Sequence, residues 1–376
     1  PPMIISTGQD IDYEGLQDIH AWYLMLDLPL TSFFKVVGGV RFETTDLTIV
    51  NTIDGGSGSR IILIEDPADN RVKFFSVNST NLSEFADVSI YQEDVLPSIG
   101  FVFEPIDNLY FRGTYAETIA RPTFKELSPI AQQDYAGAVP FFGNPDLKIT
   151  AVKNYDLRLE WNPEPSAFFS ISWFRKDLKD PIEYTLLENS SILFTRSTNY
   201  PAGRLEGWEF EARQGLGSFW EPLTGLSIGG NLTLIESEVT VPEADRGSPP
   251  GDLLPRKRDM LNAPDMLYNI NVSYENQALG TQVGLFYTYT GERLTAGATR
   301  VDEFFPNVYA LGYGTLNFSL SQKIGEHIKL SFKAKNLLDP EIQEVWRAPG
   351  VDGEVIRSSY TKGIDLSIGI SAEFTF

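Results

Sequence analysis

Few side chains in this sequence are of the types that carry out catalysis. It contains no cysteine, so a thiolate nucleophile, a zinc–thiolate site and a disulfide framework are all excluded. Of its two histidines, His20 lies on the first predicted strand and His327 beside a turn, at the start of the twelfth. We interpret each as a polar or interfacial residue rather than as a base. We therefore expect no catalytic residue, no metal ion, no cofactor and no enzyme activity.

Carboxylates are abundant, but they form no recognisable site. The chain has 51 Asp and Glu against 30 Lys and Arg, which gives a formal charge of -21. Pairs such as Glu236 and Glu238 arise by chance in so acidic a chain. The loop sequence Asp352–Gly353–Glu354 offers oxygen ligands for Ca²⁺ but lacks EF-hand spacing. The acidic charge also argues against a nucleic-acid partner, which requires a basic surface.

The polar residues that do form a pattern alternate with apolar ones. In 152–161, for example, the residues between the polar positions are Tyr155, Leu157, Leu159 and Trp161. Period two with aromatic residues predicts a strand with one apolar and one polar face. We expect the polar positions to line an aqueous lumen; they are Asn154, Asp156, Arg158, Glu160, Glu209, Glu211 and Arg213. Any wet lumen needs such residues, and we favour that interpretation over specific ligand contact.

The same alternation recurs along the whole chain, which predicts an all-β fold. No stretch approaches 18 apolar residues, so no transmembrane helix is expected. Segments of roughly ten residues match the length of a tilted strand that crosses a bilayer. The thirteen predicted strands are 17–28, 33–46, 90–104, 108–119, 152–162, 166–178, 205–215, 224–238, 265–275, 279–291, 312–323, 327–338 and 364–376.

The connections between these strands alternate in length. Short turns alternate with long connections, which cover 47–89, 120–151, 179–204, 239–264, 292–311 and 339–363. Tight periplasmic turns and long external loops are typical of an outer-membrane barrel. We therefore predict an antiparallel transmembrane β-barrel that takes up residues 1–376 as part of one domain. Alternation alone would also fit a soluble β-rich module.

The predicted barrel wall is incomplete. Bacterial barrels have an even number of strands and both termini on the periplasmic side. Thirteen strands, with the first running inwards from the outside, would leave two sheet edges unpaired in lipid, which is costly. We therefore expect further strands, in the same or a separate chain, to complete the wall.

Long external loops are where a rigid scaffold places recognition residues. The aromatic residues in three of them are candidates for ligand contact, namely Tyr135, Phe141, Phe142, Phe304, Phe305, Tyr309 and Trp346. Exposed rings can stack on sugars or chelate rings, but they can equally pack the loops on each other.

Several segments resemble the TonB-dependent receptors of the Gram-negative outer membrane. They are NLYFRGTYAETIARPTFKELSP (108–129), the stretch from FFGNPDLKIT to KDPIE (141–183), GWEFEARQGL (207–216) and KNLLDP (335–340). The block 108–183 looks most like the receptors of Bacteroidetes. Phe376 is similar to the terminal aromatic that the barrel assembly machinery recognises in such proteins.

This resemblance implies a barrel of about 22 strands, of which about thirteen lie here, with a lumen plugged by a domain absent from this sequence. It implies active uptake in the cell outer membrane of a Gram-negative bacterium. The implied partners are lipid and lipopolysaccharide, the plug and remaining strands, the barrel assembly machinery, and the TonB energy-transducing complex through the plug. The ligand stays open among ferric siderophores, haem, cobalamin, oligosaccharides and peptides. The alternatives are a passive porin, an outer-membrane enzyme and a soluble β-rich binding module.

Overall fold

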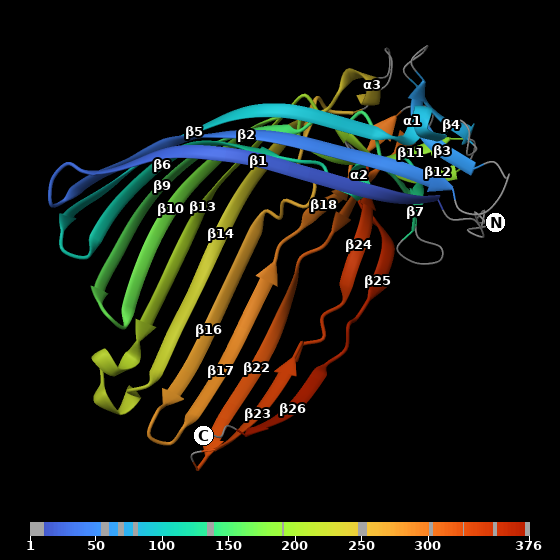
Figure 1. Ribbon diagram of the computed structural model, residues 1–376. Coiled ribbons are helices and arrows are strands. Elements are labelled where there is room, and N and C mark those ends of the chain that lie inside the picture. Colours follow the sequence, from blue (N-terminus) through green and yellow to red (C-terminus); the bar gives the residue numbers. More distant parts are fainter. Residues whose placement is uncertain are drawn as a thin grey trace.

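One long curved sheet dominates the molecule (Figure 1). The structure is a computed structural model that describes residues 11–53, 60–66, 71–77, 82–133, 139–189, 192–246, 254–300, 304–325, 327–348 and 352–372. Thirteen strands of the sheet pair in chain order, and every pair is antiparallel. These strands are β1 (Ile11–Pro29), β2 (Phe34–Ile53), β5 (Val88–Ile106), β6 (Leu109–Ala120), β9 (Thr150–Glu164), β10 (Ala167–Lys179), β13 (Ala202–Gly215), β14 (Leu226–Thr240), β16 (Met266–Asn276), β17 (Thr281–Thr290), β22 (Tyr313–Ile324), β23 (Ile328–Lys335) and β26 (Asp365–Ala372).

Each of the thirteen predicted segments overlaps one strand of this sheet, which confirms the all-β antiparallel fold class. The largest differences are at the first hairpin, where β1 begins at Ile11 and β2 ends at Ile53. Both strands run several residues further than predicted. Leu47 and Ile49 pack into a core above the sheet, and that packing extends β2 beyond the predicted end of the strand.

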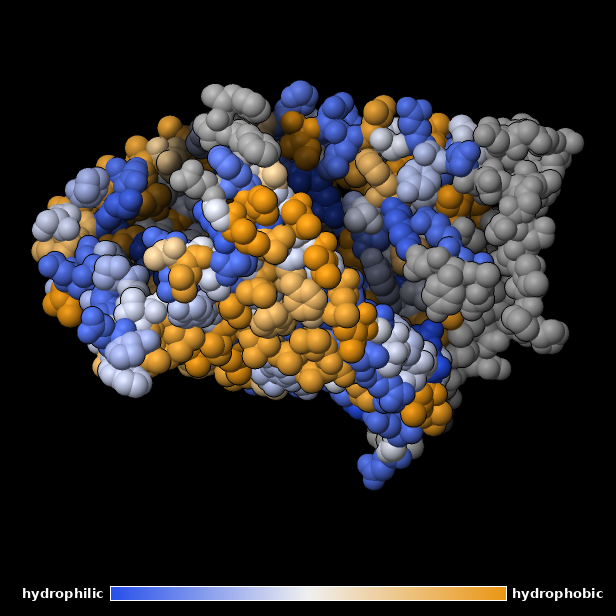
Figure 2. Space-filling view, turned by 90° about the horizontal axis from the view of Figure 1, so that it is seen from below, coloured by the Kyte–Doolittle hydropathy of each residue, from blue (hydrophilic) through white to orange (hydrophobic). Residues whose placement is uncertain are grey.

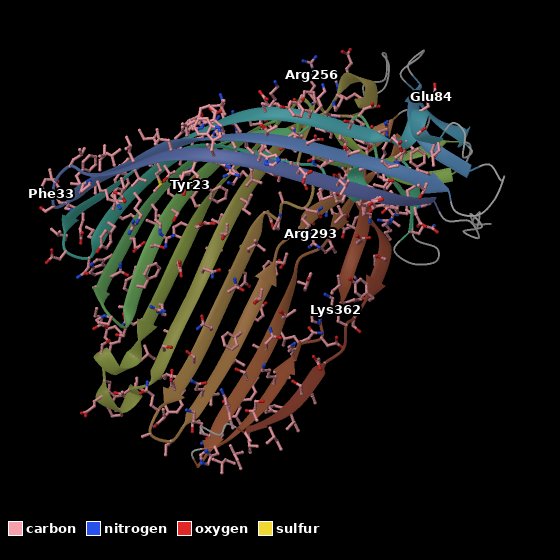
Figure 3. All side chains as sticks on the ribbon, in the orientation of Figure 1. Tyr23, Phe33, Glu84, Arg256, Arg293 and Lys362 are labelled. Atoms are coloured by element: carbon pink, nitrogen blue, oxygen red, sulfur yellow. The ribbon has the colours of Figure 1, made fainter. Side chains whose placement is uncertain are left out.

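Short connections join the strands at one end of the sheet, which we call the turn end. At the β5–β6 turn, Asn108 adopts a positive φ of 66°, a conformation that Asn tolerates better than most residues. The β13–β14 connection is longer and contains two 3₁₀ helices, η1 (Leu216–Ser218) and η2 (Glu221–Leu223). Between them Phe219 and Trp220 are strongly exposed. Phe33 in Figure 3 marks the turn end of the first hairpin.

The long connections lie at the opposite end, which we call the loop end, and they carry their own secondary structure. The sequence pattern predicted loops there, so these elements were missed. They are β3 (Arg60–Asp66), β4 (Arg71–Val77), α1 (Leu82–Ala86), α2 (Phe124–Leu127), β7 (Ala131–Gln132), β8 (Phe141–Phe142), β11 (Ile182–Asn189), β12 (Ile192–Asn199), α3 (Glu243–Arg246), β15 (Lys257–Arg258), β18 (Arg293–Ala296), β19 (Thr299–Arg300), β20 (Phe304–Phe305), β21 (Asn307–Ala310), β24 (Ile342–Arg347) and β25 (Val355–Tyr360). Glu84 in Figure 3 marks this end.

Two small four-stranded sheets organise the loop end. One has the strand order β11-β12-β8-β7, and the other has the order β18-β21-β24-β25. Each therefore joins strands from two different long connections. A parallel bridge between Thr185 and Gly297 links the two sheets.

The buried apolar cores lie among these loop-end elements rather than in the wall of the sheet. One core surrounds Leu127 of α2 and includes Leu47, Val88 and Leu147. Others lie around Phe142, Tyr200 and Val308. A single-layered wall has no partner layer, so the loop end is where the chain buries its apolar side chains.

The main sheet is open. Within the described residues, β1 and β26 each pair with one neighbour only. As predicted, β1 starts at the loop end and runs to the turn end, where β26 also finishes (Figure 1). Among the residues that the structure describes, no helix is long and apolar enough to cross a membrane.

Candidate functional site: the polar face of the wall and the loop-end sheets

The register of the main sheet collects apolar side chains on one face. Leu159, Ile171, Phe210, Leu232 and Tyr268 form one continuous row across five strands. Residues that follow each of them by two along a strand continue this face. Figure 2 shows apolar side chains gathered over a broad surface with hydrophilic residues around it. An exposed apolar band of this kind is typical of a membrane wall.

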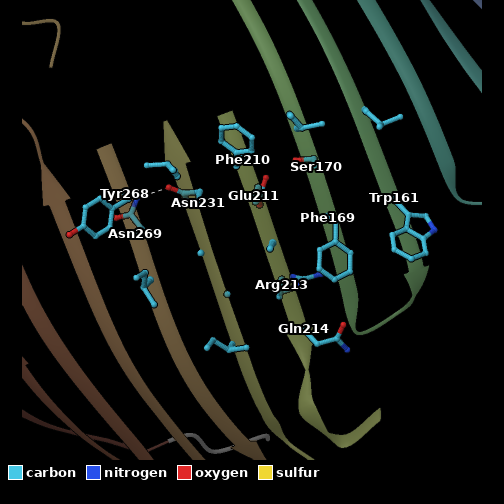
Figure 4. A pocket seen from close by; sticks show the side chains of 18 of the residues that line it. Trp161, Phe169, Ser170, Phe210, Glu211, Arg213, Gln214, Asn231, Tyr268 and Asn269 are labelled. Atoms are coloured by element: carbon cyan, nitrogen blue, oxygen red, sulfur yellow. Dashed lines mark hydrogen bonds between the residues drawn. The ribbon is translucent and has the colours of Figure 1, made fainter. Parts of the chain in front are cut away.

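A hollow of about 1250 Å³ lies on this apolar face (Figure 4). Its lining includes the small residues Ala212 and Gly230 and the rings of Trp161, Phe169 and Phe210. A hollow on this face would meet hydrocarbon rather than an aqueous solute. We therefore do not assign it as the ligand site.

The opposite face carries a network of charged side chains around Arg158. Its Nη1 donates to Ser172 Oγ at 3.1 Å, and its Nε donates to Glu160 Oε2 at 3.3 Å. Its Nη2 lies 3.6 Å from Glu211 Oε2. Arg112 Nε approaches the same Glu160 carboxylate at 3.8 Å. Three of the residues predicted to line the lumen, Arg158, Glu160 and Glu211, are thus brought together from two hairpins.

Asn154 belongs to a second polar cluster on this face, nearer the loop end. It is buried, and its Nδ2 donates to Thr118 Oγ1 at 2.9 Å. Its Oδ1 accepts from Lys176 Nζ at 2.7 Å. Because all the hydrogen-bonding groups of this amide have partners in the wall, its role here is to join three strands.

The other three polar residues singled out in the sequence share this face but not these networks. Asp156 lies opposite Thr114 and Phe174, and Glu209 lies opposite Ser172. Arg213 lies opposite Gly229. No ion pair joins any of the three to another described residue. They place charge on the polar face of the wall, and that this face lines an aqueous lumen stays a prediction.

A row of neutral polar residues, which were not among the predicted lumen-lining positions, lies on the same face. Asn269 Nδ2 donates to Asn231 Oδ1 at 2.9 Å, the bond drawn in Figure 4, and Thr288 Oγ1 donates to Asn269 Oδ1 at 2.7 Å. These side chains continue the row of Glu211 across β14, β16 and β17. The alternation pattern contained the signal, because each is flanked by apolar residues.

At the loop end, the candidate aromatic residues Phe141 and Phe142 lie in β8 and are buried. The Phe141 ring packs edge-on against Tyr184, with centroids 5.2 Å apart. Phe142, which is 1% exposed, packs against Phe194 at 5.6 Å. This arrangement favours the packing interpretation of these rings over stacking on a ligand.

Trp346 also packs one loop on another. It lies in β24 against a buried cluster that contains Leu186 and Val308. The Arg357 guanidinium covers its ring, with Cζ 5.1 Å from the centroid. Like the phenylalanines of β8, this indole joins elements from separate connections, because Leu186 lies in β11 and Val308 in β21.

The candidate aromatic residue Tyr309 lies beside a charged cluster. Arg347 Cζ lies 4.7 Å from the centre of its ring, while Nη1 and Nη2 of Arg347 pair with Glu292 and Glu354 at 2.6 and 2.8 Å. Burial, with the nearby Asp259 carboxylate, raises the pKa of Tyr309 to about 12, so the phenol stays protonated. It therefore keeps a hydrogen-bond donor at the loop end.

A buried ion pair at the loop end was not foreseen from the sequence. Arg258 Nη1 donates to Glu183 Oε2 at 2.7 Å, with the two side chains only 6% and 2% exposed. Burial raises the pKa of Glu183, and the charge of Arg258 opposes that shift. Arg258 also lies over the ring of Tyr200. In a sequence, a charged pair in two long loops cannot be distinguished from solvated surface residues.

Four of the predicted positions lie wholly or partly outside the described residues. Tyr135 and Phe376 lie outside the described residues, and only the backbone of Phe304 and Phe305 is described, in β20. Across the part of the chain that the structure describes, no group of three or more His, Asp or Glu side chains could hold a metal ion.

The comparisons identify the family. A family model described as TonB dependent receptor-like, beta-barrel, matches residues 4–337. The chain belongs to this family. TonB-dependent receptors are outer-membrane receptors and transporters of Gram-negative bacteria rather than enzymes, and they work with TonB and a plug domain. The resemblance noted from the 108–183 block and the other segments is thereby confirmed.

Similar proteins include one curated relative. It is the hemoglobin and hemoglobin-haptoglobin-binding protein of Haemophilus ducreyi, strain 35000HP, which is 22% identical over 212 residues. The match covers 52% of this chain and 21% of the relative. The chain thus corresponds to a minor part of that receptor.

Solved receptor structures share the fold of this chain. The copper transporter OprC matches with a TM-score of 0.60 and 14% identity over 96% of this chain and 49% of its own. The ferric yersiniabactin uptake receptor FyuA from Yersinia pestis gives 0.58 and 17%, over 96% and 46%. The ferric citrate transporter FecA gives 0.57 and 14%, also over 96% and 46%. The chain therefore spans about half the length of these three structures.

Proposed function

We propose that this chain forms part of the wall of an active importer, which binds a scarce ligand outside and releases it into the periplasm. The observation that carries the proposal is the family match over residues 4–337, on a sheet with one apolar face and one polar face. The loop-end sheets would contribute to binding outside, and the polar face would line the path. Energy would come from the TonB complex acting on a plug domain that fills the lumen.

We further propose that the ligand carries a metal ion. The similar proteins are described as receptors or transporters for copper, ferric yersiniabactin, ferric citrate and haemoglobin. Among the described residues, the wall offers charged and amide groups around Arg158 and Asn269 rather than a cage of metal ligands. A complexed metal, recognised through its chelator, fits such groups better than a bare ion does. An oligosaccharide or another scarce solute would need the same architecture.

Uptake measurements in cells test both parts of the proposal. Cells that carry the protein in their outer membrane are given radioactive iron as ferric citrate or as haemin. We expect uptake that stops when a protonophore collapses the proton-motive force and that is absent from a strain lacking TonB. Uptake that persists in both conditions would instead indicate a passive channel. If the cells take up only a metal-free oligosaccharide, and do so with energy, the proposal of active import would stand and the proposal of a metal-containing ligand would be wrong.

A further inference from the structure

A group of lysines on the polar face has no counterpart elsewhere in the described wall. Lys323, Lys329 and Lys333 lie on β22 and β23, towards the turn end, and all three are exposed. The register places Lys323 directly opposite Lys329, and Lys333 opposite Ser319. In a chain with a net charge of -21, this is a local concentration of positive charge.

The three ammonium groups have no ion-pair partner among the described residues. Like charges directly opposite each other on neighbouring strands, with Cβ atoms roughly 5 Å apart, destabilise a sheet. Some other cations on this face have carboxylate partners: Arg158 on β9 pairs with Glu160 and Glu211, and Lys335 on β23 lies 3.9 Å from Asp365. The lysine group is therefore arranged for negative charge that the described wall does not supply.

Beside these lysines the wall is hollowed, over a volume of about 530 Å³. Lys329 and Lys333 border the hollow, and Ser319, Ser331 and Ser371 line it with hydroxyl groups. Glu275 is the one carboxylate among its lining residues, and it accepts a hydrogen bond from Gln282 at 3.3 Å. Ammonium and hydroxyl donors around a space of this size suit a few carboxylate groups.

We propose that this lysine–serine hollow, defined by Lys329, Lys333 and its serines, docks an acidic segment of the polypeptide that fills the lumen. The inference rests on the proposed function, because it requires a plugged barrel. A lumen filled by polypeptide would desolvate the lysines, and a desolvated ammonium group needs a partner. The position near the turn end favours a resident segment over a ligand, which would arrive from the loop end. The negative groups would be Asp or Glu side chains from outside residues 1–376.

Zero-length crosslinking with a carbodiimide tests the inference, because this reagent joins lysine amines to carboxylates in contact. It is applied to the protein in isolated outer membranes, and the products are identified by mass spectrometry. We expect Lys329 and Lys333 to be joined to Asp or Glu in peptides that this sequence does not contain. Two ion pairs provide internal positive controls: Lys257 with Glu238 at 2.6 Å and Lys35 with Asp27 at 2.9 Å.

A variant pair provides the second measurement. Lys329→Glu with Lys333→Glu should abolish those crosslinks and increase the passive conductance of the protein in planar bilayers, because the segment is repelled. Lys35→Gln is the matched control, since Lys35 is also a turn-end residue of the polar face but has its own carboxylate. Its conductance should stay at the original value. Heat-modifiable mobility in SDS gels verifies that each variant folds.

The inference is overturned if the control crosslinks form while Lys329 and Lys333 react with nothing or only with Glu275 and Asp365. It is also overturned if the double variant changes anion selectivity without any crosslink in the original protein, which would indicate a site for free anions. If the crosslinks form but uptake does not depend on energy, the proposed function would be wrong and the docking contact would still be supported. The two failures are therefore distinguishable.

Discussion

Arg258 shows how a single side chain can hold the loop end together. Its guanidinium reaches Glu183 on β11, lies over the ring of Tyr200 and leaves no room for a side chain at Gly297. The Glu183 carboxylate also accepts from the backbone N–H of Leu261. Three long connections therefore meet at one buried charge pair. Such a pair contributes little net stability but is costly to break by removing one partner.

Replacing only one member of this pair should destabilise the loop end more than replacing both members. We expect Arg258→Met to destabilise the loop-end structure by about 3–5 kcal/mol, because it leaves an ionised Glu183 buried without its partner. Arg258→Met with Glu183→Leu should recover most of that loss. Trypsin digestion of the protein in isolated outer membranes measures the effect as cleavage in the external connections. Equal sensitivity of the single and double variants would contradict this account of the pair.

The wall strands were predictable from the sequence because each residue of a wall strand faces either lipid or the interior. That environment imposes period two over eight residues or more, as in β9 and β16. The loop-end strands were not predictable in the same way. β8 has two residues and pairs with β12, which lies about fifty residues further along the chain.

The candidate site residues show the same difference between positions set by local alternation and positions set by distant contacts. The shared face of Arg158 and Glu211 follows from alternation, which a sequence displays directly. Whether Phe142 or Trp346 is exposed depends on contacts with β12 and β21, which local sequence does not specify. The capped turn of α2 is an intermediate case. Thr123 and Glu126 form a capping box that could be recognised in the sequence, but the hydrogen bond from Tyr184 to Glu126 could not.

Two neighbouring residues of β16 test the assignment of the faces. Ile270 lies on the apolar face and Asn271 on the polar face. Ile270→Arg should cost roughly 2–4 kcal/mol, because it places a charge against hydrocarbon near the middle of β16. Asn271→Arg should cost little, since its side chain meets water or polar groups. Denaturant unfolding in lipid vesicles, monitored by the loss of heat-modifiable mobility, measures both costs. A larger cost for Asn271→Arg than for Ile270→Arg would mean that the two faces are assigned the wrong way round.

At the scale of the whole molecule, the open edges of the sheet set the strongest physical demand. On β1, apolar side chains are exposed on both faces of the strand. Trp22 and Tyr23, for example, are 62% and 70% exposed. Every second N–H and C=O of β1 and β26 points away from the sheet and needs a partner, because an unpaired backbone group in hydrocarbon costs several kcal/mol. The solved receptors of the same fold are about twice as long as this chain, so the family has strands to supply these partners.

Amide hydrogen exchange of the protein in its native membrane tests whether those edges are paired. We expect the outward-pointing amides of β1 and β26 to be as strongly protected as amides in the middle of β9 and β10, because neighbouring strands close the barrel. The interior strands serve as the reference within the same sample, since both their neighbours are present. Fast exchange confined to alternate residues of β1 and β26 would mean that the edges meet water. In that case the sheet would stay open, and the polar face around Arg158 would line a groove rather than an enclosed path.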